Sequence, residues 1–530
     1  MNNLSESHEC GCCAGRRRFL AAGCGLCAAA LVPGVFGRSA SFAAETPGDA
    51  KPGRPRVRLV FACLALKQDR PTWPHIGYDF TADIERVTSA LQRLCPEVEL
   101  LPVVAHTPEH AEKLLAADRA DRIDGYVIYQ MNNWAKAMLP VIASGKPTIV
   151  ADFIFAGTGG ALVYTADLRG KHDNFSLVAS SRIEDLAEAV KRFTLLRQGA
   201  TPAEFAAVCD RLRRARTPAE SLSVCKDDSP RIADVSDCLA AMKRSKLISV
   251  GKKMRDAAQE AKQQLGIEIV DVSYEEIAAA YEAADRDRAR ELAARWKSKA
   301  RSIELDDADA TLEGSGRMYL ALQDVLKKQQ SDAITVECLG GFYGGFFKAY
   351  PCLGFTELLD AGMIGACQAD ILSSVTMIAM KHLVGRPGYI SNPAIDTSKR
   401  RIIYSHCVAT TKPFGPDGPA NPYSILTHAE DLSGASVRSF LPEGYMTTTL
   451  EIQPARREIL CHRAKSVENV VEPRGCRTKL ACEVVGDMEK LLTFWDRDRY
   501  YWHRVTFFGD FWEPVKELAA ALRFKFVEEA

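Results

Sequence analysis

The sequence predicts an α/β protein with two parallel-sheet α/β domains, followed by a β-rich, antiparallel and barrel-like C-terminal domain. Short apolar runs alternate with segments of helical spacing, and this alternation restarts after residue 230. From about residue 400 it gives way to short, closely spaced strand patterns. Strand–helix alternation is typical of parallel sheets covered on both faces, whereas strands without intervening helices indicate a sandwich or barrel. We therefore place the domains at residues 56–200, 230–385 and 395–530.

In the first domain, the apolar run Val57–Leu64 predicts a strand, and Ala82–Cys95 carries apolar residues at helical spacing. The other predicted elements are strands at Val98–Val104, Ile123–Tyr129 and Pro147–Phe153, and helices at His106–Ala117 and Asn133–Ser144. Ligands of such sheets bind beyond the carboxyl ends of the strands, where this chain carries Gln130–Asn133 and the loop Ala156–Gly160. The glycines of this loop fit a phosphate cradle or a plain turn, and the lack of a nucleotide fingerprint favours the turn.

A polar, basic stretch with two prolines, Arg211–Arg231, connects the first domain to the second. Beyond it, Tyr274–Lys299 predicts one long helix whose acids and bases face solvent. The other predicted elements are strands at Leu247–Val250, Ile267–Val272 and Ala333–Glu337, and helices at Ile232–Lys243, Met254–Leu265, Gly316–Gln330 and Ile371–Leu383. This second unit is similar in build to the first.

The C-terminal part contains short β-type runs separated by Gly, Pro and Asn, and a final helix at Trp512–Leu522. The predicted strands are Ile402–Val408, Ala435–Leu441, Met446–Ile452, Glu458–Arg463, Lys479–Val485 and Val505–Phe508. Their regular spacing favours an antiparallel sheet that closes or stacks on itself.

The first 45 residues have the features of an export signal rather than of a domain. Arg16–Leu20 fits the twin-arginine pattern R-R-x-F-L, the weakly apolar segment Ala21–Phe36 follows it, and Ser41–Ala43 offers a small-x-small cleavage site. Glycines and a proline interrupt the apolar segment, which is shorter than the roughly 20 apolar residues of a spanning helix. We expect export by the twin-arginine machinery to the periplasm or the extracellular space, without a stable membrane anchor.

Composition narrows the function only slightly. The chain has 68 Lys+Arg and 68 Asp+Glu, without a basic stripe, so we expect no nucleic-acid partner. Five of its 17 cysteines fall in the export signal, namely Cys10, Cys12, Cys13, Cys24 and Cys27. The twelve that remain form no C-x-x-C pair, and most are expected to be buried as small apolar side chains.

Two acids and one histidine are the main candidates for chemistry. Glu337 ends an apolar strand run, Asp370 precedes a predicted helix, and His503 lies on an apparent strand near the C-terminus. Taken alone, Asp370 fits a helix cap and Glu337 fits a salt bridge or cap. The alternative is a divalent-metal site assembled from distant segments, for which carboxylates and imidazole are suitable ligands.

Further candidates have weaker signals. Asp396 lies in a polar loop before the first strand of the β-rich domain, and His406 lies on that strand. His428 and His462 have no acidic neighbour at ligand spacing, so we expect no functional role for them. The sequence contains no G-x-S-x-G, no H-E-x-x-H, no Walker loop and no G-x-G-x-x-G after a strand, which argues against the corresponding hydrolase, metalloprotease, kinase and nicotinamide-enzyme classes.

The C-terminal two-thirds of the chain resembles the L-fucose isomerase and L-arabinose isomerase superfamily. The similar segments, in order along the chain, are Leu247–Gly251, Leu265–Ile267, Ala333–Glu337, Pro351–Leu353, Leu358–Gly362, Gly365–Asp370, Asp396, His406–Cys407 and His503–Asp510. The resemblance implies two α/β domains with a β-rich C-terminal domain, in agreement with the pattern described above.

The resemblance also implies a reaction. Family members interconvert aldoses and ketoses with a divalent metal, usually manganese, that binds adjacent sugar oxygens while a carboxylate moves a proton between C1 and C2 through an enediol. By similarity, Asp370 and Glu337 would be catalytic, and Asp370, His503 and Glu337 would hold the metal. Such an enzyme is an intramolecular oxidoreductase.

The expected partners are a small sugar and further copies of this chain. The resemblance implies trimers or hexamers in which neighbours complete the sites. We expect substrate contacts from Asp396, His406 and Gln368, and from His172 in the site of a neighbouring subunit.

One departure leaves a second interpretation open. Gln368 stands where relatives carry a glutamate, and a glutamine can neither act as a base nor give negative charge to a cation. The alternative to an exported isomerase is therefore a non-catalytic carbohydrate-binding relative that has lost part of the metal site.

Overall fold

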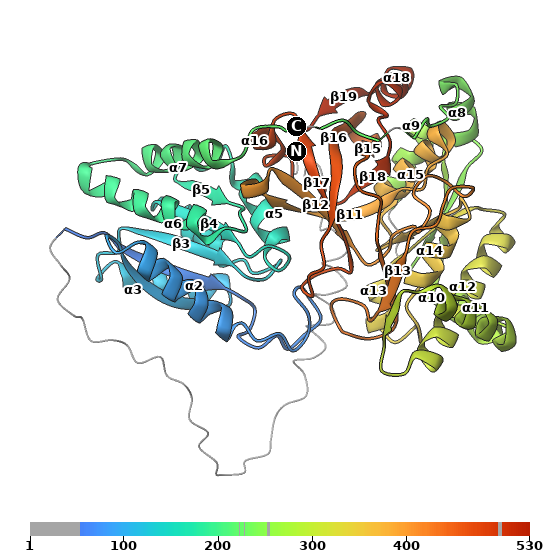
Figure 1. Ribbon diagram of the computed structural model, residues 1–530, viewed down its shortest axis with the longest axis horizontal. Helices are drawn as coiled ribbons and strands as arrows, with labels where there is room; N and C mark the ends of the chain where they lie inside the picture. The colour runs from blue at the N-terminus through green and yellow to red at the C-terminus, as the bar shows by residue number, and fades with distance from the viewer. Residues whose placement is uncertain (1–52, 222, 227, 252–254, 497–500) are drawn as a thin grey trace, which may run out of the picture.

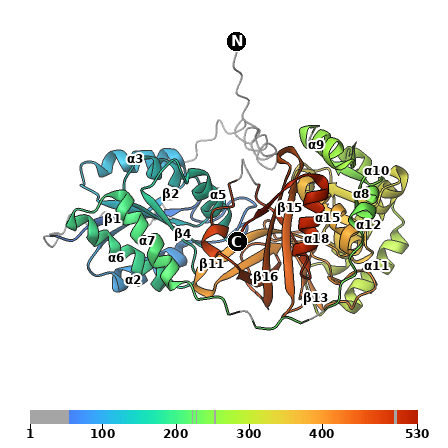
Figure 2. The ribbon, with the colours of Figure 1, turned by 90° about the horizontal axis from the view of Figure 1, so that it is seen from above.

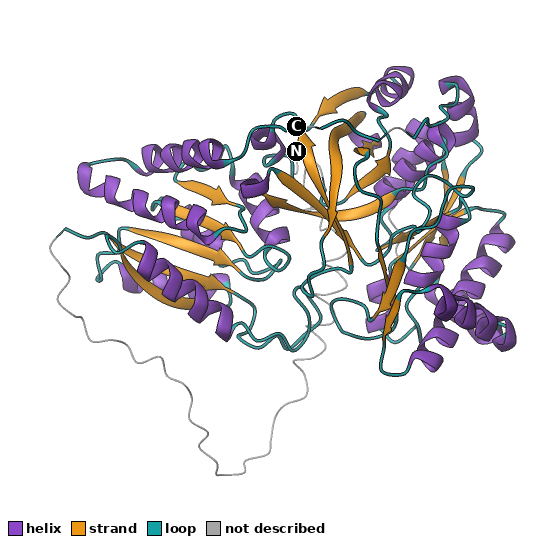
Figure 3. Cartoon of the chain, in the orientation of Figure 1, coloured by secondary structure: helices purple, strands orange, loops and turns teal. Residues whose placement is uncertain are grey.

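The computed structural model describes residues 53–530, apart from 222, 227, 252–254 and 497–500. The predicted export signal, residues 1–45, lies outside these described residues. Figure 1 shows an α/β domain at either side of the molecule with a β-barrel between them, and Figure 2 shows the same order from above. The predicted fold class, two parallel-sheet domains followed by a β-rich domain, is confirmed (Figure 3).

The first domain is a five-stranded parallel sheet with the strand order β2-β1-β3-β4-β5. Its strands are β1 (Arg56–Ala62), β2 (Glu99–Ala105), β3 (Gly125–Gln130), β4 (Thr148–Asp152) and β5 (Phe175–Val178). The helices α3, α4 and α5 contribute to the apolar core on one face, and α2, α6 and α7 to the core on the other. These helices are α2 (Thr81–Leu94), α3 (Pro108–Asp118), α4 (Met138–Ala143), α5 (Thr158–Leu168), α6 (Ile183–Lys191) and α7 (Pro202–Arg216).

The second domain is a four-stranded parallel sheet with the strand order β10-β9-β6-β7. Its strands are β6 (Lys246–Val250), β7 (Glu268–Val272), β9 (Ala333–Val336) and β10 (Ile364–Cys367). Its helices are α8 (Val235–Met242), α9 (Arg255–Leu265), α10 (Tyr274–Ala283), α11 (Arg286–Lys299), α12 (Ala308–Gln329), α13 (Cys338–Tyr343), α14 (Cys352–Asp360) and α15 (Ile371–Val384).

The prediction of one helix over Tyr274–Lys299 is wrong, because α10 ends at Ala283 and α11 starts a new helix. The carboxylate of Asp285 accepts hydrogen bonds from the backbone N–H groups of Asp287 and Arg288. These donors are among the groups that a helix N-terminus leaves unpaired, so the aspartate acts as an N-cap.

The C-terminal domain is a closed six-stranded antiparallel barrel. Its strand order is β15-β18-β11-β12-β17-β16, and β16 pairs back to β15. The barrel strands are β11 (Tyr389–Asp396), β12 (Arg401–His406), β15 (Met446–Gln453), β16 (Glu458–Asn469), β17 (Thr478–Val485) and β18 (Arg504–Phe508). After α18 (Trp512–Leu522), the strand β19 (Lys525–Glu528) adds in parallel to β16.

A small sheet joins the second domain to the barrel domain. Its strand order is β14-β13-β8, built from β8 (Ser302–Glu304), β13 (Tyr423–Leu426) and β14 (Ser436–Ser439). Among the described residues, no helix combines the length and the apolar character that crossing a membrane requires.

The carboxyl end of the first sheet lies against the barrel. Phe155, just beyond β4, shares a buried cluster with the barrel residues Ala394 and Ile403. Just beyond β5, the backbone N–H and the hydroxyl of Ser181 both donate to the carboxylate of Asp396 at the end of β11. Polar groups that follow the strands of this sheet therefore lie at a domain junction.

Candidate functional site

The carboxylates of Glu337 and Asp370 follow two neighbouring parallel strands. Strands β9 and β10 pair with Val336 opposite Cys367, so both acids leave the sheet at the same edge. Each also caps the helix that it precedes: Glu337 accepts from the N–H of Gly340 at 3.4 Å, and Asp370 accepts from the N–H of Ser373 at 2.9 Å. The cap interpretation is therefore correct for both residues, and it fixes where the two carboxylates point.

An unusual turn directs Asp370. Gln368 and Ala369 have φ values of 63° and 47°, so two successive residues with a Cβ atom occupy the left-handed region. Such conformations cost of order 1 kcal/mol or more for each residue and persist only where the surroundings impose them. The turn brings the chain from β10 to the first turn of α15 within three residues.

The structure brings Asp370 and His503 into direct contact, although they are 133 residues apart in the sequence. The Nδ1 atom of His503 lies 2.7 Å from Oδ2 of Asp370, and the hydroxyl of Ser373 donates to the same oxygen at 2.8 Å. Burial alone would raise the pKa of Asp370, but the hydrogen bond and charge of His503 bring it below its usual value. The aspartate therefore stays ionised and orients the imidazole.

The outer nitrogen of His503 is available to a ligand. In the described part of the chain, Nε2 of His503 is buried and has no hydrogen-bond partner. The ring of His406 lies near it, with ring centroids 5.6 Å apart, and neither of its nitrogens has a partner in the same residue set. Burial, and then the proximity of His503, lowers the pKa of His406 to about 3, so this ring is neutral.

His406 also borders a small internal hollow of about 10 Å³, room for roughly one water molecule. Cys367 and Gly365 of β10 line the same hollow. The structure thus brings His406 to the edge of the sheet that carries Asp370.

Asp396 and His172 are placed elsewhere. The oxygens of Asp396 accept hydrogen bonds from Ser181 and from the backbone and hydroxyl of Ser398, which ties the barrel to the first domain. His172 lies in the loop after α5, where it forms an isolated bridge with Arg169. Within the described ranges, the hydrogen bonds of Asp396 are made at this junction and not with Asp370 or His503.

The sequence interpretation missed Glu451. This residue lies on β15, is fully buried, and has no hydrogen-bond partner for either carboxylate oxygen among the residues that the structure describes. Burial, and then the charge of Asp370, raises its pKa well above the usual value, so the side chain is a neutral acid. One sequence feature could have indicated this residue: Glu451 is an acid within an otherwise uncharged strand segment, where it alternates with Thr447 and Thr449.

The expectation for His428 and His462 is wrong as regards their acidic neighbours. Nδ1 of His428 lies 3.1 Å from Asp431, and Nδ1 of His462 lies 2.8 Å from Glu529. Asp431 is three residues away in the sequence and could have been noticed. Glu529 is 67 residues away from His462, so the sequence alone could not identify it as a neighbour.

The loop Ala156–Gly160 is shaped by close packing. A Cβ atom at Gly157 would lie 1.8 Å from the carbonyl oxygen of Gln130, and one at Gly160 would lie 2.2 Å from that of Asn133. The glycines therefore allow α5 to approach the end of β3 closely, which is the plain-turn interpretation. Gly159 also lies close to Trp502, the residue before His503.

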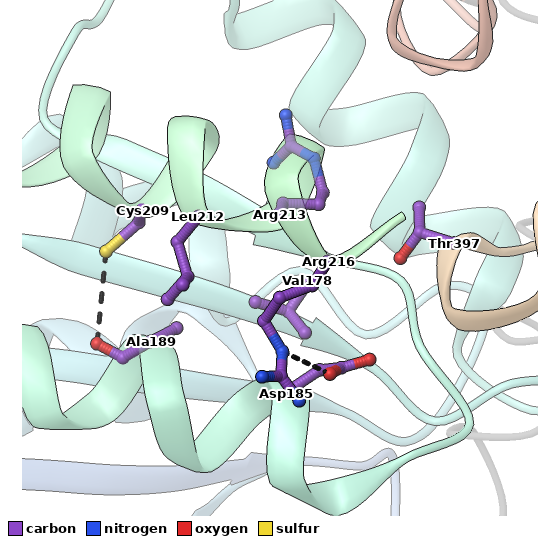
Figure 4. Close-up of a pocket in the computed structure, with 8 residues that line it drawn as sticks. All are labelled: Val178, Asp185, Ala189, Cys209, Leu212, Arg213, Arg216 and Thr397. Atoms are coloured by element: carbon purple, nitrogen blue, oxygen red, sulfur yellow. Dashed lines mark hydrogen bonds and ion pairs between the residues drawn. The ribbon is translucent and has the colours of Figure 1, made fainter. Parts of the chain in front are cut away.

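A second hollow, of about 10 Å³, lies under α7 in the first domain (Figure 4). Arg216 donates to Asp185 at its edge, and Cys209 donates to the carbonyl oxygen of Ala189. Its lining is mainly apolar and its charges are paired, so we assign no site to it.

No group of three or more His, Cys, Asp or Glu side chains in the described ranges is already arranged to hold a metal ion.

Eleven of the twelve cysteines in those ranges are buried and all twelve are free thiols, which confirms the expectation that most of them are buried.

No protein-family model matches this chain. A sulfoquinovose isomerase from Priestia aryabhattai is 25% identical over 109 residues, which is 20% of this chain and 24% of that protein. A sulfoquinovose isomerase from Alkalicoccus urumqiensis is 22% identical over 122 residues, or 22% of this chain and 27% of that protein. The matches thus span about a quarter of the length of these relatives, and they support a relationship to sugar isomerases.

Solved structures add no argument to this relationship. A sugar-binding protein of a sugar ABC transporter from Bacillus halodurans matches with 10% identity and a TM-score of 0.17, covering 62% of this chain and 87% of that chain. A TM-score this low does not indicate a shared overall fold.

Proposed function

We propose that this protein is an exported, divalent-metal-dependent sugar isomerase that interconverts an aldose and a ketose through an enediol. The observation that carries the proposal is the contact between Asp370 and His503 at the sheet edge where Glu337 also ends a strand. Similarity to sulfoquinovose isomerases over a fifth of the chain supports the reaction class.

The donor set fits a divalent cation such as Mn²⁺. The buried Nε2 atom of His503 has no partner among the described residues, and two carboxylates, Asp370 and Glu337, lie at the same sheet edge. Imidazole nitrogen and carboxylate oxygen suit Mn²⁺ and related cations. When bound, the cation would act as a Lewis acid on adjacent oxygens of the sugar.

The protein side chains have separate roles in the proposed reaction. Asp370 stays ionised and holds Nδ1 of His503, which leaves Nε2 to face the ligand. Glu337 is our candidate to carry the proton between C1 and C2, since a carboxylate at this sheet edge can act as a general base. Gln368 and the neutral ring of His406 would hydrogen-bond sugar hydroxyls.

Export and assembly are part of the proposal. Arg16–Leu20 supports recognition by the twin-arginine machinery, which would deliver the folded protein to the periplasm or beyond. We further propose a homo-oligomer, a trimer or hexamer, in which His172 reaches the site of a neighbour. A shortened N-terminus after secretion and the mass of the assembly in solution test these two points.

Metal analysis of the purified mature protein, followed by a panel of aldoses that includes sulfoquinovose, tests the central proposal. We expect a bound divalent cation that a chelator removes, and ketose formation that returns when the metal is restored. His503→Ala should abolish both, whereas His110→Ala, at an exposed position on α3, should leave them unchanged. Sugar binding without a cation and without turnover would instead support the carbohydrate-binding alternative. If the protein shows no sugar binding and no turnover, both proposals are refuted.

A further inference from the structure

A second group of reactive side chains lies where β12 and β17 end side by side. The two strands pair with His406 opposite Thr478, and each strand is adjoined by a buried cysteine: Cys407 follows β12, and Cys476 lies two residues before β17. The thiol of Cys476 donates a hydrogen bond to the sulfur of Cys407. Two thiols from distant parts of the sequence are thus in contact.

A histidine and an aspartate are aligned behind Cys407. His428 donates to the sulfur of Cys407, and its Nδ1 atom lies 3.1 Å from Oδ1 of Asp431. The hydroxyl of Tyr350 donates to the other oxygen of Asp431 at 2.5 Å, and its ring stacks on the imidazole with centroids 4.6 Å apart. These contacts fix the orientation of His428 toward the sulfur, as in sites where a histidine activates a cysteine.

The charges of this group favour a thiolate. Burial alone would raise the pKa of Cys407, but the hydrogen bond from Cys476 and the charge of His428 bring it well below its usual range. Burial alone would lower the pKa of His428, but Cys407 and Asp431 raise it well above its usual value. The pair therefore exists as thiolate and imidazolium, the form in which a cysteine is nucleophilic.

Cys338 shares one of these features, because a hydrogen bond from Cys367 lowers its pKa. Most of the other buried cysteines in the described ranges have a raised pKa instead. Burial raises the pKa of both Cys63 and Cys209 to about 12, so each remains a thiol near neutral pH. Burial raises the pKa of Cys461 further, well above its usual value. A buried thiol in apolar surroundings is chemically inert, so we expect Cys407 to react faster than Cys63, Cys209 and Cys461.

We propose that Cys407 and Cys476 form a peroxide-reactive thiol pair that closes to a reversible disulfide. The thiolate of Cys407 attacks one oxygen of hydrogen peroxide, an S–O bond forms, the O–O bond breaks, and the departing hydroxide takes a proton from His428 to become water. The sulfur of Cys476 then attacks the sulfenic acid, its proton leaves with the hydroxyl group as a second water, and the S–S bond forms. Two thiols are oxidised by two electrons, and one peroxide is reduced to two waters.

A small oxidant suits the position of the pair. Cys407 has 3% of its surface exposed and Cys476 has 7%, so bulky disulfide reagents would be excluded while hydrogen peroxide could enter. Because His406 immediately precedes Cys407, the modified residue lies next to the candidate functional site without being one of its proposed metal ligands.

The test exposes the reduced full-length mature protein to hydrogen peroxide at neutral pH, then blocks free thiols and maps the peptides under non-reducing conditions. We expect a peptide that links Cys407 to Cys476 and disappears on treatment with dithiothreitol. Oxidation at Cys407 should be faster than at Cys461 by on the order of tenfold or more. A link between another pair of cysteines, or equal rates at Cys407 and Cys461, would overturn the proposal.

Three variants separate the two steps. Cys476→Ser should stop the reaction at a sulfenic acid on Cys407, which dimedone traps, and His428→Asn should slow the first step. Cys461→Ser is the matched control, because it replaces an equally buried thiol and should leave the reaction unchanged. If Cys476→Ser prevents dimedone labelling of Cys407, the proposed order of steps is wrong. The kinetics of the unsubstituted protein provide a test that does not depend on how well the variants fold.

Discussion

Replacing Asp152 by asparagine is expected to stabilise the protein at neutral pH and to leave its stability in acid almost unchanged. Asp152 ends β4 and is almost completely buried, with 3% of its surface exposed. Burial raises its pKa from the usual 3.8 to about 7, against the opposing effects of the nearby Thr158 hydroxyl and the charge of Arg474. The folded protein therefore holds a proton on this carboxyl group at pH values where the unfolded chain has released it.

The magnitude follows from linkage between proton binding and folding. Below pH 3.8 the carboxyl is protonated in both states and contributes no difference. Between 3.8 and about 7 the unfolded chain releases the proton and the folded protein keeps it, so stability falls by about 1.36 kcal/mol per pH unit, or about 4 kcal/mol over three units. Above pH 7 the folded form also ionises, and this loss of stability remains constant.

Urea unfolding at pH 4, 5.5 and 7, followed by hydrogen exchange of the β4 amides, measures the effect within the first domain. The advantage of Asp152→Asn should be near zero at pH 4 and grow to about 4 kcal/mol at pH 7. Asp118 is the matched control: it is equally buried, but it accepts hydrogen bonds from Arg58 and Tyr126. Asp118→Asn should therefore destabilise the domain. An advantage of Asp152→Asn that does not change between pH 4 and 7 would refute the argument.

Three further substitutions test the site and its surroundings. Asp370→Asn should weaken cation binding about 10- to 100-fold in a calorimetric titration with Mn²⁺, because the orientation of His503 is lost; unchanged affinity would exclude that role. Gln368→Glu adds a carboxylate at the same turn and should raise that affinity on the order of tenfold, and a loss of affinity would show that the side chain points away from the cation. Gly157→Ala should lower the free energy of unfolding by at least about 2 kcal/mol, since its Cβ atom would lie 1.8 Å from the carbonyl oxygen of Gln130; a neutral result in urea unfolding would mean that α5 can shift.

The order of strands and helices could be predicted because each depends on local pattern. Buried parallel strands such as β3 and β4 consist of continuous apolar runs, and they were placed to within a few residues. The break between α10 and α11 was missed because the segment keeps good helix formers on both sides of Asp285. The N-cap that divides it depends on one aspartate among many charged residues.

The candidate site could be predicted only in part. A cap signal placed Asp370 at a helix start, and a strand pattern placed His503 near β18, but no local pattern states that the two meet. Their contact depends on the second sheet packing its carboxyl edge against the barrel. The left-handed turn at Gln368 and Ala369 could not be predicted from the sequence either, since neither residue favours that conformation by itself.

Glu451 shows why the charge balance of the site had to come from the structure. The structure places this acid near Asp370, and complete burial keeps it protonated and uncharged. The ionised group beside the imidazole of His503 is then Asp370, and the carboxylate of Glu337 lies at the same sheet edge.

Asp370 brings one negative charge to the proposed cation site, and the ring of His406 is neutral. In a buried site an uncompensated charge costs several kcal/mol, so an acid at position 368 would add affinity for the cation but would make the cation-free site less stable. A glutamine there retains hydrogen-bonding groups for a sugar hydroxyl without adding another charge to the site. On this argument the departure at Gln368 is compatible with catalysis, provided that Glu337 rather than residue 368 carries the proton. Glu337→Gln should therefore abolish turnover while Gln368→Glu preserves it. Turnover that survives Glu337→Gln in an isomerase assay would exclude Glu337 as the group that carries the proton.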